Sequence, residues 1–143
     1  MRVWGFVDIS ISRFDNSPMT RPGAVRRVKS YSASNGYVYQ YCFYEVNRIT
    51  YEGETAGEFV YAVSADRQTT FPLRIVVVQA ALQVWAQANG CALTSSEVYA
   101  VAKMRLFQAF DEGEVPVTAG GGEELRLVVD ESRLEELLRM LNI

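Results

Sequence analysis

The stretch that decides the fold runs from residue 30 to residue 46 and reads SYSASNGYVYQYCFYEV. Its centre, Asn35-Gly36, is typical of a two-residue hairpin loop, because these residue types tolerate the positive φ angles of a type I′ turn. The runs on either side of this dipeptide are therefore predicted to be two antiparallel strands. Strands that follow one another in the chain usually pair, so the hairpin indicates an antiparallel sheet.

The turn also sets a predicted register. If Ser34 and Tyr37 flank the turn, Ser32 lies opposite Tyr39. One face of the second strand then carries four aromatic residues, namely Tyr37, Tyr39, Tyr41 and Phe43. Tyr31 falls on the other face, which we expect to be the wetter one.

Alternation of apolar residues predicts further strands near residues 2–12, 59–63 and 71–78. From Gln79 the apolar spacing becomes helical, and Asn89-Gly90 supplies a C-terminal stop.

The sequence Thr94-Ser95-Ser96-Glu97 matches a capping box, so a second helix is expected to begin there and to continue to about Asp111. This helix is apolar around much of its circumference, which indicates that it is covered on two sides.

Residues 111–123 show no periodicity and include Gly120-Gly121-Gly122, which indicates a flexible connection. A strand at Leu125–Val129 and a helix capped by Asp130 follow it. The whole pattern predicts one α+β domain over residues 1–143. We expect an antiparallel meander sheet of about five strands, with helices packed on one face and a C-terminal βα unit at an edge.

Length and composition agree with a single globular domain. The chain has 143 residues, of which 49% are hydrophobic and 22% charged, so it has enough apolar surface for one core. Its first apolar run is interrupted at Asp8, and no later run reaches transmembrane length. Cys42 and Cys91 are too few for a disulfide scaffold and are expected to be buried thiols. We therefore expect a cytoplasmic protein that does not enter membranes.

The net charge of −3 is unevenly distributed. Residues 1–30 carry six basic and two acidic side chains, a net charge of +4, whereas residues 111–143 carry nine acidic and three basic ones, a net charge of −6. The two ends could pair within the fold or between subunits. The acidic total argues against general affinity for nucleic acids.

The chain contains no histidine, which excludes Ser-His and Cys-His nucleophile pairs, histidine metal sites and histidine acid–base catalysis from its own residues. A zinc centre would need two carboxylates beside both cysteines, an unusual ligand set for that ion. The triplet Gly120-Gly121-Gly122 is followed by Glu123-Glu124, which would repel phosphate, so it does not form a P-loop. No metal or cofactor is expected.

Basic residues near the hairpin tyrosines could form a nucleic-acid platform, in which cations hold phosphates and rings stack on bases. The predicted register supplies local partners instead. It places Arg26 opposite Glu45 and Arg27 opposite Tyr44, a cross-strand ion pair and a cation–π contact. Nucleic-acid binding by this sheet surface is therefore kept only as a third alternative.

The function that best fits these observations is a non-catalytic binding or assembly domain, with self-association among its uses. The rival from another class is a small-molecule enzyme that uses tyrosine and Asp or Glu side chains. Two groups of residues are candidates for an interaction surface: Leu134, Leu137, Leu138 and Leu141 of the last helix, and Tyr37, Tyr39 and Tyr41 of the hairpin. The leucine stripe must be covered, either by the chain's own sheet or by exchange with a second subunit.

Overall fold

The computed structural model describes residues 27–115 and 125–143, and the strand predicted near residues 2–12 lies outside them. The elements follow one another as β1 (Lys29–Ser32), β2 (Val38–Tyr51), β3 (Glu54–Ser64), β4 (Phe71–Val78), α1 (Gln79–Asn89), α2 (Ser95–Asp111), β5 (Leu125–Val129) and α3 (Glu131–Met140). The strands form one sheet in the order β1-β2-β3-β4-β5.

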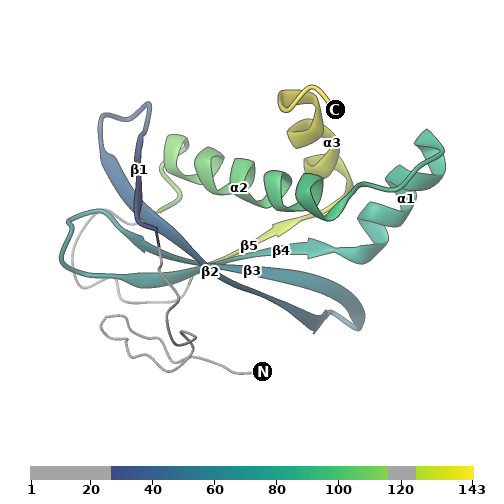
Figure 1. Cartoon of the computed structure of the whole chain (residues 1–143), viewed down its shortest axis with the longest axis horizontal. Coiled ribbons are helices and arrows are strands. Elements are labelled where there is room, and N and C mark those ends of the chain that lie inside the picture. The colour runs from purple at the N-terminus through teal and green to yellow at the C-terminus, as the bar shows by residue number, and fades with distance from the viewer. Residues whose placement is uncertain (1–26, 116–124) are drawn as a thin grey trace.

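The predicted fold class is confirmed. Strands β1 to β4 are antiparallel neighbours, and β5 joins β4 in parallel at the edge of the sheet. Parallel pairing needs a crossover connection, which α1 and α2 provide between these two strands. All three helices lie on the same side of the sheet (Figure 1). In the described part of the chain, no helix is long and apolar enough to cross a membrane.

The hairpin forms at the predicted place, but its predicted register is wrong by one residue. Tyr31 lies opposite Tyr39, and Ser32 opposite Val38. The reason is a longer loop, in which the N–H of Ala33 donates to the carbonyl of Tyr37 over 2.9 Å. Only Gly36 in this loop has a positive φ, of 94°, as in three-residue loops that end in a left-handed residue.

The one-residue shift brings Tyr31 to the face of the sheet that the helices cover. Its ring stacks on Phe107 of α2, with the centroids 4.3 Å apart. Tyr39 stacks in the same way on Phe110 at 4.4 Å, and Tyr41 meets Phe107 edge-on. Tyr31 is therefore part of the packing beneath α2, and its predicted position on the wetter face is wrong.

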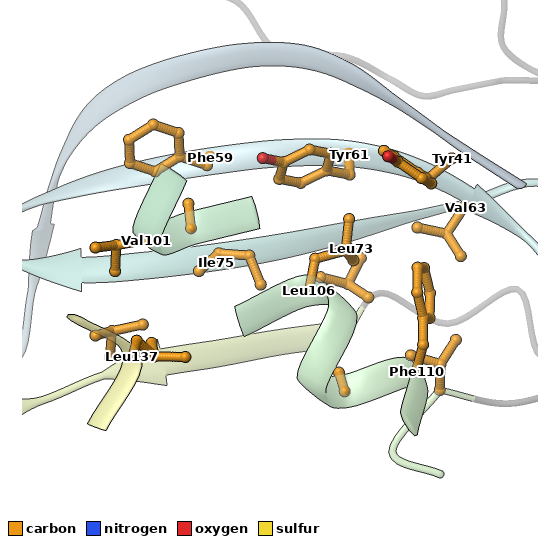
Figure 2. Close-up of a cluster of buried hydrophobic side chains, with 14 of the residues drawn as sticks. Tyr41, Phe59, Tyr61, Val63, Leu73, Ile75, Val101, Leu106, Phe110 and Leu137 are labelled. Atoms are coloured by element: carbon orange, nitrogen blue, oxygen red, sulfur yellow. The ribbon is translucent and has the colours of Figure 1, made fainter. Parts of the chain in front are cut away.

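The hydrophobic core lies between the sheet and α2 and α3 (Figure 2). Tyr61, Leu73 and Ile75 point from the sheet into this layer and are fully buried, and Leu106 meets them from α2. Alternate residues of each strand supply this face, as expected for a half-covered sheet. The core accounts for the apolar periodicity of the strands and of α2.

The predicted helix boundaries are confirmed by the caps. The Thr94 side chain accepts from the backbone N–H of Glu97, and the Glu97 side chain accepts from that of Thr94, which completes the capping box. Helix α1 ends at Gly90, which has a φ of 79°. Asp130 caps α3 by accepting from the N–H of Arg133 over 2.9 Å.

Asp111, where we expected a flexible connection to begin, is the last residue of α2 and is tied to the β1–β2 hairpin. Its Oδ1 accepts from the N–H of Ser34 over 2.9 Å, and the Asn35 amide donates to the carbonyl of Phe110 over 3.2 Å. Asp111, the first residue of the predicted 111–123 connection, is thus bound to the hairpin, and residues 116–123 lie outside the described residues.

Helix α3 docks on its own domain. Leu134, Leu137 and Leu138 are buried, and Leu141 is partly buried against the same core. The helix packs against α1, α2 and β5. In the structure, the leucine stripe is covered by the core of its own chain, which is one of the two expected alternatives.

Candidate functional site

A groove of about 280 Å³ lies between α1 and α3. We call it the α1/α3 groove. Its lining consists of Ala81, Val84, Trp85, Ala88 and Asn89 from α1 with Glu131, Ser132, Leu134 and Glu135 from α3. It is open to solvent and is apolar on its α1 side.

Helical spacing explains the apolar wall. Residues 81, 84, 85 and 88 recur at intervals of three and four, so they share one face of α1. Ala81 and Leu134 are buried and form the floor, whereas Val84 remains 47% exposed. Trp85, the largest side chain of the lining, is half-buried. The groove thus combines a fixed floor with an exposed apolar rim.

The acidic wall comes from Glu131 and Glu135, which are four residues apart and therefore lie on the same face of α3. Both are exposed, and within the described part of the chain neither has an ion pair. Helix α1 ends beside them with no basic residue in its last turn. The negative end of its macrodipole adjoins the groove, as does the positive end of α3, whose first turn holds Glu131.

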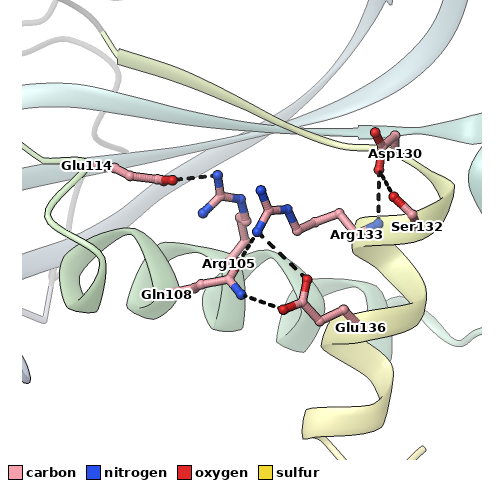
Figure 3. Close-up of polar contacts among 7 residues, drawn as sticks. All are labelled: Arg105, Gln108, Glu114, Asp130, Ser132, Arg133 and Glu136. Atoms are coloured by element: carbon pink, nitrogen blue, oxygen red, sulfur yellow. Dashed lines mark hydrogen bonds and ion pairs between the residues drawn. The ribbon is translucent and has the colours of Figure 1, made fainter.

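The other acidic residues near α3 already have partners. Figure 3 shows Arg105 and Arg133 side by side between α2 and α3. Arg105 lies 3.0 Å from Glu114, while Arg133 donates to the Gln108 side chain over 2.9 Å and lies 3.8 Å from Glu136. The charges of this cluster are balanced, although Nε and Nη1 of the buried Arg105 make no hydrogen bond.

A second cluster of charged side chains lies on the face of the sheet away from the helices. Glu58 is 5% exposed and forms ion pairs with Arg74 at 3.2 Å and Arg126 at 3.4 Å, bridging three strands. Burial lowers the pKa of Arg74, and the carboxylate of Glu58 opposes this effect. This cluster stabilises charged groups in the sheet and leaves Glu58 little access to a substrate.

The buried tyrosines Tyr39 and Tyr61 bear on the hypothesis of an enzyme that uses tyrosine side chains. The hydroxyl groups of Tyr39 and Tyr61 make no hydrogen bond, and burial, together with the nearby Tyr99, raises the pKa of Tyr61 well above its ordinary value. Both residues are 0% exposed, however, so no substrate could reach them in this conformation. They act as core residues.

The described residues contain no group of three or more Cys, Asp or Glu side chains placed to hold a metal ion. Cys91 is exposed and Cys42 is half-buried, so the expectation that both thiols are buried is wrong. Cys91 is exposed because it lies just after Gly90, in the loop between α1 and α2.

The structure does not bring the predicted surface residues together at an exposed site. Leu134, Leu137 and Leu138 are buried, as are Tyr39 and Tyr41, and only Tyr37 is largely exposed, at 49%. Arg27 precedes β1 and is exposed, and Arg26 lies outside the described residues. Stacked against α2, Tyr39 and Tyr41 are not available to stack on bases.

Sequence reasoning missed the groove. In the sequence, Trp85 is one of the apolar residues at helical spacing after Gln79, and Glu131 and Glu135 are two of the nine acidic residues of the C-terminal region. Their spacing within each helix was visible, but nothing in the sequence indicated that α1 and α3 are neighbours.

Comparison with known proteins assigns no family to this chain. No family model matches this chain, and neither the curated proteins nor the solved structures contain a significant match.

Proposed function

We propose that this chain is a non-catalytic binding or assembly domain whose recognition surface is the α1/α3 groove. The observation that carries the proposal is the composition of this groove: exposed Val84 and half-buried Trp85 lie beside two carboxylates that form no ion pair with any other described residue. Apolar clefts with a few convergent polar groups are typical binding sites.

The distribution of charged partners supports this choice. Glu58, Asp111 and Glu114 hold arginine, tyrosine or backbone groups of the fold itself. Glu131 and Glu135 hold no such group among residues 27–115 and 125–143, so they are available to a partner. A cytoplasmic location is part of the same proposal and rests on the low cysteine content and the exposed thiol of Cys91.

A peptide-display selection against the folded chain tests this function. Enriched peptides are then titrated against the parent and against Val84→Arg, which fills the groove at a position that is exposed and therefore tolerant. Saturable binding that the variant loses supports a binding domain. Sedimentation of the parent over a range of concentrations tests assembly in parallel.

A monomer that yields no groove-dependent peptide would contradict the proposal. Turnover of a small molecule that Tyr39→Phe or Tyr61→Phe abolishes, with the fold unchanged, would favour the enzyme hypothesis instead.

A further inference from the structure

We propose that the α1/α3 groove receives a lysine or arginine side chain presented by a basic segment of a partner protein. This inference rests on the proposed binding function and names the chemistry of the partner. It draws on the size of the groove, its walls and its uncompensated charge.

The size of the groove favours a single long side chain. At about 280 Å³, the cavity is just below the range of roughly 300–1,000 Å³ that is usual for small-molecule sites. A nucleotide or a similar cofactor would extend far beyond it.

The walls fit both halves of a basic side chain. The aliphatic stem can lie along Ala81, Leu134 and the ring of Trp85, as long cationic side chains commonly cover apolar surface. A cationic head near the face of Trp85 gains a further attraction from the ring quadrupole.

The charge of the groove selects the sign of the ligand. Glu131 and Glu135 have no ion pair among the described residues, and the adjacent end of α1 carries no basic side chain. Asp130, which caps α3, adds a third carboxylate at the positive end of that helix. A cationic group would therefore be attracted, whereas a carboxylate or phosphate would be repelled.

The exposed rim favours a peptide over a free amine. Val84 is 47% exposed beside the cavity, and a small amine seated between Trp85 and the carboxylates would leave it in water. A segment of chain that presents the basic side chain can cover Val84 as well.

The test follows the indole N–H signal of Trp85 in nitrogen-15 correlation spectra, assigned by its loss in Trp85→Phe. The probe is a short peptide of alternating alanine and lysine, blocked at both ends. Its matched controls replace lysine by acetyl-lysine, which is neutral, or by glutamate. We expect only the lysine peptide to shift the signal saturably.

Charge variants identify the acidic wall. The double variant Glu131→Gln/Glu135→Gln should weaken lysine-peptide binding by about tenfold, whereas Glu112→Gln should leave it unchanged. Glu112 is a matched control because it is exposed at the far end of α2. Circular dichroism checks that each variant remains folded.

Four results would overturn the inference: equal binding of the acetyl-lysine peptide, equal weakening by Glu112→Gln, binding of butylammonium as tight as that of the peptide, or no saturable binding of the lysine peptide. A parent dimer that Glu135→Lys dissociates would identify a second copy as the occupant and would also overturn it. If groove-dependent peptides are acidic or purely apolar, the binding function survives while this inference fails.

Discussion

Tyr31 donates its hydroxyl hydrogen to Oδ2 of Asp111 over 2.7 Å, although the two residues are 80 positions apart in the chain. The other carboxylate oxygen of Asp111 accepts from the N–H of Ser34. One aspartate thus joins the tip of the β1–β2 hairpin to the C-terminal end of α2. This contact exists only because the hairpin register places Tyr31 on the face beneath α2.

We predict that Tyr31→Phe lowers the free energy of unfolding by about 1–2 kcal/mol, because it removes this hydrogen bond to a charged group while the ring can still stack on Phe107. Urea unfolding followed by circular dichroism measures the change. Tyr37→Phe is the matched control, since Tyr37 is exposed, and it should change the free energy by less than about 0.5 kcal/mol. Equal effects of both variants would refute the role of the Tyr31–Asp111 bond.

The same bond predicts a dependence of stability on alkaline pH. Burial, followed by the hydrogen bond to Asp111, raises the pKa of Tyr31 to about 12. The folded state therefore favours the neutral phenol, so this contribution to stability is complete below the ordinary tyrosine pKa of about 10 and is lost as pH rises through 12. Absorbance at 295 nm should show a late-titrating tyrosine that is missing in Tyr31→Phe. Identical titration curves for the parent and the variant would contradict the prediction.

The Glu58 cluster predicts unequal effects of two charge-removing substitutions. Glu58→Gln should lower the free energy of unfolding by about 2–4 kcal/mol, because Arg74 then remains largely buried without this carboxylate. Arg126→Gln should cost less than about 1 kcal/mol, since the Arg126 side chain is 48% exposed and its ion pair is weakened by solvent. Chemical denaturation of both variants gives the comparison. A larger loss for Arg126→Gln would show that the cluster is organised differently.

Leu137→Asp tests the docking of α3. Leu137 is 0% exposed, so a carboxylate at this position would be buried without a partner, and we expect a loss of more than about 4 kcal/mol. Thermal melts at two protein concentrations should show the same loss, because the helix packs within its own chain. A variant that remains folded and sediments as a smaller particle than the parent would instead indicate exchange of α3 between subunits.

The ends of the helices were predictable because they depend on short-range chemistry. The Thr94–Glu97 capping box, the left-handed Gly90 and the Asp130 cap each involve residues no more than four apart, and all three were read correctly. The register of the hairpin was not predicted correctly, because the side chain of Asn35 can take part in two different kinds of loop. In the structure its side chain accepts from the N–H of Tyr37 and donates to the carbonyl of Phe110, which belongs to a distant helix.

The candidate site could not be predicted from the sequence either, because it depends on contacts between residues that are far apart in the chain. The α1/α3 groove, which we propose binds a lysine or arginine side chain, brings Trp85 together with Glu131 and Glu135, which are at least 46 positions away in the chain. Periodicity shows that each helix has an apolar face and a polar one, but it does not show which helices meet. The leucine residues of α3, predicted as an interaction surface, are instead part of the hydrophobic core and of the floor of the groove.

By itself, the sequence determined the α+β class, the order of the described elements, the helix caps and the absence of histidine chemistry, because these follow from composition, periodicity and contacts within one turn. The tertiary structure alone decided the register of the hairpin, the position of Tyr31 beneath α2 and the meeting of α1 with α3. These depend on long-range packing, in which a loop longer by one residue moves every side chain of a strand to the opposite face. The groove arises where two helices, each amphipathic for its own local reasons, are brought together by the parallel pairing of β5 with β4.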